Sequence, residues 1–336
     1  TLTEEDNAFT GNIIITNAKD VQLTNSLDTT FGGSQVFGDL TVIANDGTDA
    51  KDIDLSDNAN AIHGSINFDG ADVSIYNTEE TLLAGGNAAG DLTIKSALGI
   101  SSDDNDITAG GFIEITALDG DLTLGAGITE GTVTAGGHIS LEAKTDSSGD
   151  AHSIVVNSAV KTTDDNYGAI SLNATGDITV NNSLDAASFI VVEAKENIDI
   201  KASLTANQAE SITEFGINID SSVAGDINFA DETEIVAAKG SINISATKGD
   251  IILESDLIKA SEESVGIHAY DGTVKIGTAN AAPADKVTAA ADISISASGD
   301  VTSNADLLAG NDVVIGSTGA NVVINADISA TVGKID

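Results

Sequence analysis

The chain of 336 residues contains no cysteine, methionine or tryptophan, and all 13 of its basic residues are lysine, so arginine is absent as well. Without cysteine there are no disulfides, no thiolate metal ligands and no cysteine nucleophiles. The formal net charge of −40 argues against nucleic acid and anionic membranes as partners, because both attract lysine and arginine. Aromatic residues make up 3% of the chain, so a wide core filled by rings is not expected.

Long apolar runs are also missing. None approaches the roughly 20 residues that a membrane helix requires, so we expect no membrane insertion. No signal peptide is visible and the chain opens at Thr1, which suggests a processed or excised segment. Pro283 is the single proline beside 34 glycines, a balance that suits short strands joined by tight turns.

One short phrase, with the pattern apolar–polar–apolar–polar–Ala, recurs six times. Its copies are Ile113–Ala117, Ile139–Ala143, Ile170–Ala174, Ile190–Ala194, Ile242–Ala246 and Ile293–Ala297. Alternation with a period of two residues is typical of β-strands. In most cases a second short strand follows, often after Gly-Asp, as at Gly176-Asp177. A strand-like repeat every few tens of residues indicates a solenoid.

The first apolar residues of the strand pairs define about 13 turns with an average spacing of ~25 residues. These residues are Ile13, Leu40, Ile66, Leu92, Ile113, Ile139, Ile170, Ile190, Ile217, Ile242, Val274, Ile293 and Val313. Parallel crossover connections are overwhelmingly right-handed. The sequence therefore predicts an all-β fold, a right-handed parallel β-helix that runs through residues 1–336 without an internal domain boundary.

Alternation predicts which side chains face the core. In Ile113–Ala117 the two isoleucines and the alanine point inward, while Glu114 and Thr116 point outward. Alanine at the third inward position predicts a tight corner, and the aspartate of the following Gly-Asp is expected to close an Asx-type turn.

Two segments depart from the pattern. We expect residues 77–89 to form an irregular loop, and residues 201–214 to hold one helical turn or a wide excursion. Neither end carries a capping pattern, so either the segment was cut from a longer repeat region or its ends stack on neighbouring copies.

Clustered loop aspartates are candidate calcium ligands, because calcium takes six to eight oxygen ligands. The residues that we single out for such a site are Asp103, Asp104, Asp106, Asp164 and Asp165. The chain has neither the EF-hand pattern nor the Gly-Gly-x-Gly-x-Asp calcium repeat, and a solvated acidic surface is the alternative interpretation. We expect no required cofactor, and calcium binding is one of two open interpretations.

The sequence gives little evidence for a catalytic site. With 53 acidic residues, pairs of carboxylates arise easily by chance, and the four histidines (His63, His138, His152 and His268) share no ligand spacing. We therefore expect no enzymatic activity. The alternative is a carbohydrate-active β-helix protein, either a polysaccharide lyase or hydrolase or a glycan-binding adhesin.

The repeat also resembles a known class. The phrase Gly-x-Ile-x-Ile/Leu-x-Ala followed by Gly-Asp-Ile is clearest in residues 110–124, 168–180 and 240–253, and it resembles the central repeats of filamentous-haemagglutinin-like exoproteins. The resemblance implies a right-handed parallel β-helix that a Gram-negative cell secretes for adhesion, aggregation or biofilm matrix. It thus implies an extracellular stalk or filament-forming segment. The implied partners are copies of itself joined end to end or the rest of a longer adhesin, together with surface glycans. The secretion domain of that class, with its Asn-Pro-x-Gly signals, does not occur in this sequence.

Overall fold

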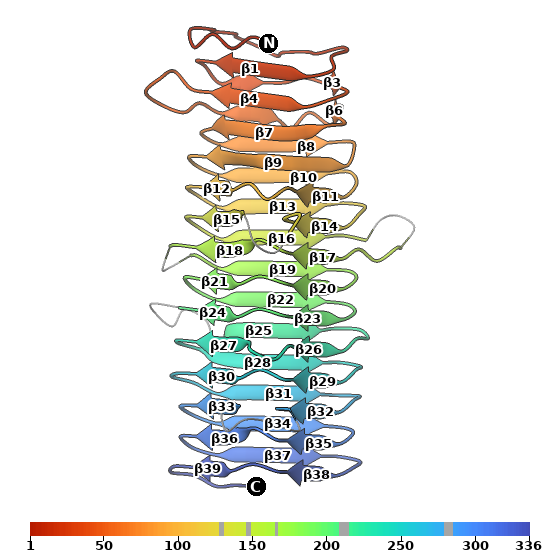
Figure 1. Cartoon of the computed structure of the whole chain (residues 1–336), viewed down its shortest axis with the longest axis vertical. Coiled ribbons are helices and arrows are strands. Elements are labelled where there is room, and N and C mark those ends of the chain that lie inside the picture. The colour runs from red at the N-terminus through yellow and green to blue at the C-terminus, as the bar shows by residue number, and fades with distance from the viewer. Residues whose placement is uncertain (128–130, 146–148, 165–166, 208–214, 279–284) are drawn as a thin grey trace. The chain divides into compact units, whose positions relative to one another are not determined.

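A computed structural model describes residues 1–127, 131–145, 149–164, 167–207, 215–278 and 285–336. The chain divides into two compact units, Thr1–Thr163 (unit 1) and Asp164–Asp336 (unit 2). Each unit is a parallel β-solenoid, and all regular elements among the described residues are strands (Figure 1). Counted over both units there are about 13 turns, which confirms the predicted fold class. The right-handed winding and the absence of a domain boundary stay predictions.

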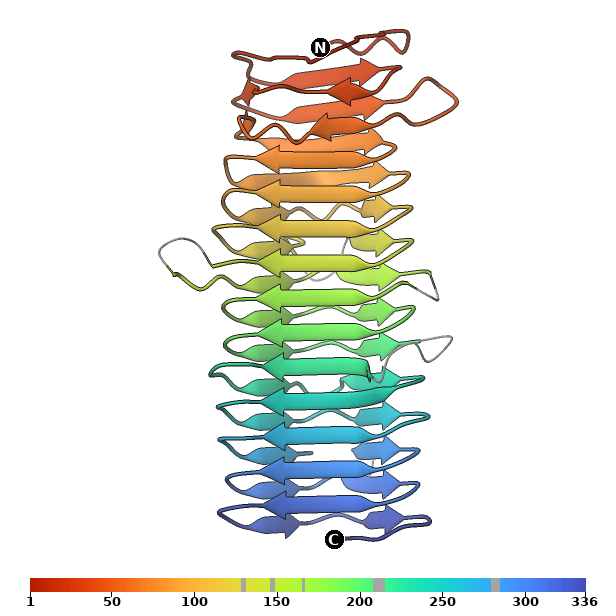
Figure 2. The same cartoon turned by 180° about the vertical axis from the view of Figure 1, so that it is seen from behind.

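A regular turn contains three strands. One strand of about five residues, which we call the long strand, is followed by two short strands, the first and the second short strand. Ile190–Ala194, Ile198–Ile200 and Leu204–Ala206 form one such turn. Figure 2 shows the long strands from the other side of each unit. The second short strand was not anticipated, since three-residue segments carry little periodicity.

In unit 1 the long strands are β8 (Val73–Asn77), β10 (Leu92–Ser96), β13 (Ile113–Ala117) and β16 (Ile139–Ala143). Two shorter strands, β2 (Thr29–Thr30) and β5 (Ile53–Leu55), hold the same position in the first turns. The opposite side begins with four undivided strands, β1 (Val21–Asn25), β4 (Leu40–Ala44), β7 (Ser65–Gly70) and β9 (Thr81–Ala88). It continues as short-strand pairs, β11 (Ile100–Ser102) with β12 (Ile107–Ala109), β14 (Leu122–Leu124) with β15 (Thr132–Ala135), and β17 (Ile154–Val156) with β18 (Ala159–Thr162). Strands β3 (Gln35–Val36) and β6 (Ala61–Ile62) pair with each other.

In unit 2 the long strands are β19 (Ile170–Ala174), β22 (Ile190–Ala194), β25 (Phe215–Ser221), β28 (Ser241–Ala246), β31 (Val265–Ala269), β34 (Ile293–Ala297) and β37 (Val313–Ser317). The first short strands are β20 (Ile178–Val180), β23 (Ile198–Ile200), β26 (Ile227–Phe229), β29 (Ile251–Leu253), β32 (Val274–Ile276), β35 (Val301–Ser303) and β38 (Val322–Ile324). The second short strands are β21 (Leu184–Ala186), β24 (Leu204–Ala206), β27 (Glu234–Ala237), β30 (Leu257–Ala260), β33 (Lys286–Ala289), β36 (Asp306–Ala309) and β39 (Ile328–Ala330).

The core is a stack of aliphatic side chains held in register by the strand ladders. In β28 and β31, Ile242 lies beside Val265 and Ile244 beside Ile267. All four side chains are 0% exposed. The inward alanine is buried as predicted, for example Ala246. Equal inward residues in successive turns thus bury one continuous apolar column within each unit.

The prediction of a loop at residues 77–89 was wrong over most of its length, because Thr81–Ala88 forms β9, the longest strand among the described residues. Its first half pairs with β11 and its second half with β12, so one strand of this turn covers two strands of the next. A register shift between Ile66 and Phe68 marks the β7–β9 pairing, and Gly85 takes a positive φ of 82° there. Glycine tolerates that conformation, so Gly85-Gly86 accommodates a bulge inside the strand instead of ending it.

Some predicted turn starts were also wrong. Ile13 makes only an isolated bridge to Phe31, while Leu40 and Ile66 belong to the side opposite the long strands. Val274 begins a first short strand, and the long strand of that turn starts at Val265. Leu204–Ala206 is a strand where a helical turn was one expectation; residues 208–214 lie outside the described part.

The last turn of unit 2 exposes side chains that earlier turns bury. Val322 pairs with the fully buried Val301 and is itself 43% exposed, and Val332 and Ile335 are 83% and 53% exposed. No helix in the described residues has the length and apolarity needed to cross a bilayer.

Candidate functional site: side-chain ladders and a polar depression

In unit 2 the residue just before a first short strand makes the same contact before β23, β26, β29, β32 and β38. Its backbone N–H donates to the side-chain oxygen of the equivalent residue one turn earlier. The donor–acceptor pairs are Asn197 to Asp177 (2.8 Å), Asp226 to Asn197 (2.9 Å), Asp250 to Asp226 (2.8 Å), Thr273 to Asp250 (2.8 Å) and Asn321 to Asp300 (2.9 Å). We call this series the aspartate ladder. Because Asn197 fills the same role as its neighbours, the position requires an acceptor oxygen and not a charge.

Unit 1 has an equivalent ladder before its long strands. The pairs are Asp52 to Asp28 (3.2 Å), Asp72 to Asp52 (3.2 Å), Asp91 to Asp72 (2.9 Å) and Phe112 to Asp91 (3.1 Å). These carboxylates satisfy backbone N–H groups at corners where the chain leaves the sheet. The Asx-type turn expected for Gly-Asp is therefore wrong in detail, since the oxygen bonds the next turn instead of its own.

The ladders account for some of the acidic residues and bring like charges close together. Carboxylates in consecutive turns lie about 4.8 Å apart at strand spacing. Their repulsion is screened by salt, whose Debye length is about 8 Å at physiological ionic strength. Salt therefore weakens the repulsion between these carboxylates.

Three of the candidate calcium ligands lie together between β11 and β12 of unit 1, and the structure gives each a local bond. Asp103 accepts from the N–H and the side-chain amide of Asn105, at 3.0 and 2.8 Å. Asp104 Oδ1 accepts from the Gly127 N–H at 2.8 Å. Asp106 Oδ1 accepts from the N–H and the hydroxyl of Thr132, at 2.8 and 2.9 Å. Asp103 thus bonds within its own loop, while Asp104 and Asp106 hold the loop against the following turn.

The other two candidates belong to unit 2. Asp164 Oδ1 accepts from the Tyr167 N–H at 3.3 Å, and Asp165 lies outside the described residues. Within the described ranges, no group of three or more His, Asp or Glu side chains is placed to hold a metal ion. Calcium binding at the five predicted residues stays a prediction.

Three histidines of unit 1 each lie beside a carboxylate. The nitrogen–oxygen distances are 3.7 Å for His63 and Glu79, 3.7 Å for His138 and Glu114, and 3.2 Å for His152 and Asp119. Two of the imidazoles also stack on phenylalanine rings, Phe37 on His63 and Phe112 on His138, with centroids 5.3 and 5.2 Å apart. The three pairs lie apart along the chain and form no common centre.

The fourth histidine, His268, lies on the outer face of β31. Its Nδ1 is 2.8 Å from Ser296 Oγ in the next turn, and burial lowers the pKa of His268. Gly266 makes room for the ring, because a Cβ there would lie 3.0 Å from His268 Nε2. In the sequence, the only sign of this arrangement is Gly266, a glycine at an outward strand position.

Asp285, just before β33, is the one acidic side chain buried among the described residues, with 7% exposed. Burial raises its pKa, and the Asp256 and Asp231 carboxylates act in the same direction. The Thr278 N–H, 3.3 Å from Oδ2, opposes this shift. Nothing in the local sequence distinguished this aspartate from the exposed ones.

The first turns of unit 1 bury asparagines whose amides are fully engaged. Asn25, Asn60 and Asn77 are 0% exposed. Asn77, for example, accepts from the Ile62 N–H at 2.9 Å and donates to the Ile62 carbonyl at 2.9 Å. These buried amides replace backbone pairing at a corner, so their role is structural.

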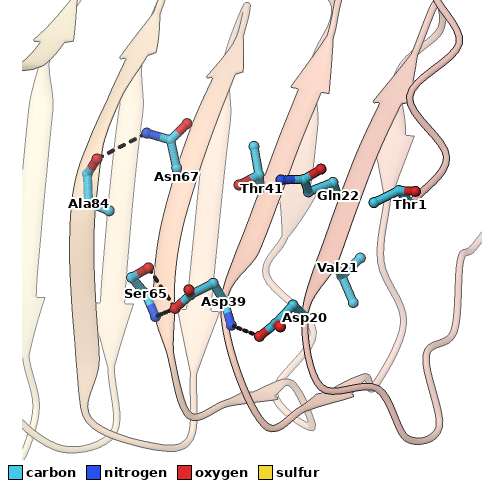
Figure 3. A pocket seen from close by; sticks show the side chains of 9 residues that line it. All are labelled: Thr1, Asp20, Val21, Gln22, Asp39, Thr41, Ser65, Asn67 and Ala84. Atoms are coloured by element: carbon cyan, nitrogen blue, oxygen red, sulfur yellow. Dashed lines mark hydrogen bonds between the residues drawn. The ribbon is translucent and has the colours of Figure 1, made fainter.

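A polar depression of about 390 Å³ lies on the outer face of β1, β4 and β7 (Figure 3). It is lined by Thr1, Asp20, Val21, Gln22, Asp39, Thr41, Ser65, Asn67 and Ala84. A short ladder runs along one side, in which Asp39 N–H donates to Asp20 Oδ1 at 3.3 Å and Ser65 N–H to Asp39 Oδ1 at 2.9 Å. The Ser65 N–H, assisted by the Ser65 hydroxyl, lowers the pKa of Asp39.

No family model, curated protein or solved structure matches the chain. The parallel β-solenoid is established by the structure.

Proposed function

We propose that the chain is an extracellular structural protein, a stalk or filament-forming segment of a Gram-negative surface adhesin or matrix fibre of the filamentous-haemagglutinin-like kind. The observation that carries this proposal is the use of the side chains. Inward residues form one aliphatic column per unit, and the corner aspartates hold consecutive turns together through the ladder contacts. Side chains engaged in this way resist separation of the turns.

The composition supports a location outside the cell. The net charge of −40 favours a medium that supplies counterions. The same charge keeps laterally adjacent molecules apart unless cations screen it, which favours contacts along the stack of turns.

The last turn of unit 2 supports assembly through stacked strands. Val322 and Ile324 occupy inward positions, in register with the buried Val301 and Ser303, yet Val322 is 43% exposed. An uncovered strand with an apolar inner face is a template for pairing with a further turn. We propose that this turn comes from a second copy or from the rest of a longer adhesin.

Sedimentation velocity over a range of concentrations tests the assembly. We expect association that Val322→Arg abolishes, because the charge would enter the apolar contact between turns. The matched control is Thr302→Arg, on the outer face of β35, which should leave association unchanged. A chain that stays monomeric at every concentration would contradict association between copies and leave only the rest of a longer adhesin to cover the last turn. A Val322→Arg variant that associates like the original would contradict the contact through stacked strands.

A further inference from the structure

One serine and one histidine of unit 2 form a hydrogen-bonded pair on the outer face of the long strands. His268 on β31 is in register with Ser296 on β34, and His268 Nδ1 is 2.8 Å from Ser296 Oγ. Strands β31, β34 and β37 are neighbours in the stack (Figure 1). A serine hydroxyl at this distance from an imidazole nitrogen is in place to give its proton to that nitrogen.

The surroundings of His268 place the lone pair of the ring on Nδ1, toward the serine. A Cβ at Gly266 would lie 3.0 Å from His268 Nε2 and 3.4 Å from Asn243 Oδ1, so both atoms border the space that this glycine leaves. The Asn243 amide nitrogen donates to Asn218 Oδ1 at 2.9 Å, which leaves Asn243 Oδ1 as an acceptor. An acceptor on that side favours a proton on Nε2, and Nδ1 then accepts from the Ser296 hydroxyl.

The imidazole is in its basic form at neutral pH. Burial lowers the pKa of His268, and no charged side chain adds to or opposes this effect. On the outer face His268 is flanked by Ser245 of β28, Ser296 of β34 and the Tyr270 ring of its own strand. The Asp220 carboxylate lies one turn further and accepts from Ser245 Oγ at 2.6 Å. A neutral imidazole can accept the serine proton, whereas an imidazolium cannot.

The hydroxyl of Ser296 can be approached from the side of the next turn. The residue in register there is Gly316 on β37, and a Cβ at Gly316 would meet no atom within 4 Å. Val314, two residues earlier on the same face of β37, is 45% exposed. A small apolar group therefore has room over Gly316 and a hydrophobic contact at Val314.

The strand ladders limit the chemistry that the pair can carry out. They engage the backbone N–H groups on both sides of β34, so the described residues offer no pair of free N–H groups to stabilise an oxyanion at Ser296. Attack on an activated ester depends less on such donors, because its leaving group departs readily. Hydrolysis of the resulting serine ester depends on them fully. The pair therefore suits a single transfer and not repeated turnover.

We propose that Ser296, with His268 as its base, is a covalent acceptor site for a small acyl group that is delivered as an activated ester or thioester. Ser296 Oγ forms a bond to the carbonyl carbon, and the bond from that carbon to the leaving oxygen or sulfur breaks. The serine proton passes to His268 Nδ1 and from there to the leaving group. One acyl group remains on the outer face of unit 2. This activity is additional to the structural role and can fail while that role stands.

The test is incubation of the full chain with p-nitrophenyl acetate, with nitrophenolate release followed by absorbance and the acetyl group located by mass spectrometry. We expect a fast release of about one equivalent per chain, with acetyl on Ser296 and none on Ser294. Ser294 is an outward serine of the same strand, but Gly266 and Val314 are in register with it instead of a histidine. The rate at Ser296 should rise with pH through the lowered pKa of His268 and level off above it, because only neutral imidazole takes the proton.

Three variants separate the nucleophile, the base and the approach. Ser296→Ala should abolish the fast release, and His268→Gln should slow acetylation of Ser296 about tenfold or more, the scale of general-base assistance. Gly316→Val should also slow it, because the valine would cover the hydroxyl, and the open space at Gly316 lets the fold accept the new side chain. Ser294→Ala is the matched control and should react like the original chain.

The proposal is overturned if Ser296 stays unmodified or if Ser294 is acetylated at an equal rate. It is also overturned if His268→Gln leaves the rate unchanged, or if the rate does not fall as the pH is lowered. Any of these results would leave the contact between Ser296 and His268 as a bond that only holds two turns together.

Discussion

The aspartate ladder makes a sharp prediction at Asp226, which takes part in two of its contacts. The N–H of Asp226 donates to Asn197 Oδ1, and its own Oδ1 accepts from the Asp250 N–H at 2.8 Å. Asp226→Ala keeps the first contact and removes the second. Asp226→Asn keeps an acceptor oxygen in the same place and removes only the charge.

The expected magnitude follows from that bond. A hydrogen bond to a charged group contributes about 1.5–3 kcal/mol, and the exposure of Asp226 reduces this to about 1 kcal/mol, because water replaces part of the lost contact. Asp226→Ala should therefore lower the midpoint of thermal unfolding by about 2–4 °C, the scale for a unit of this size. Asp226→Asn should stay close to the original, as Asn197 does in its own turn.

Hydrogen exchange gives the local assay, because stability in a repeat array depends on neighbouring turns. Asp226→Ala should speed exchange at the Asp250 amide and at the start of β29, while Asp226→Asn should not. Asp271→Ala, at an exposed aspartate whose side chain is outside the ladder, is the control. If the Asn and Ala variants lose equal protection, the charge and not the acceptor matters, and the ladder explanation fails.

Three further substitutions test the rest of the account. Ile244→Ala should destabilise unit 2 by about 2–5 kcal/mol in chemical denaturation, because the side chain is 0% exposed; a loss below that of an ordinary surface change would refute the inward assignment. Asn243→Asp should lower the unfolding temperature relative to Asn243→Ser, because the amide that donates to Asn218 Oδ1 at 2.9 Å is lost and a carboxylate faces that oxygen; equal melting would argue against this outer contact. Asp285→Asn should raise stability at neutral pH, since burial raises the pKa of Asp285 in the folded state and its ionised form is therefore unfavourable. That penalty disappears as pH falls through the raised pKa, so melting curves of the two proteins should converge in acid, and a constant gap would contradict the argument.

Alternation was enough to predict the solenoid and the inward residues, because Ile242 and Ile244 obey a period of two that needs no tertiary information. Alternation alone could not show which strand of the turn Val274 begins, because a three-residue strand and the start of a long strand look alike in sequence. The strand β9 was missed because Gly85-Gly86 reads as a loop unless the positive φ of a bulge is known.

The ladders and the depression could not be predicted from the sequence, for a different reason. The Asp250 N–H meets a side chain 24 residues earlier, and that pairing depends on the register of the turns. The contact of an outward residue such as Asn243 gives no signal in the sequence, because its partner is supplied by the neighbouring turn.

Electron microscopy of the purified chain, with and without millimolar calcium, tests the structural role most directly. The account predicts fibres in which copies join strand to strand along the stack of turns, longer or more numerous where calcium screens the carboxylates, and shortened by Val322→Arg. Separate particles in both conditions, at concentrations where the chain is soluble, would contradict the proposed filament. That result would favour ligand binding on the outer faces as the function instead.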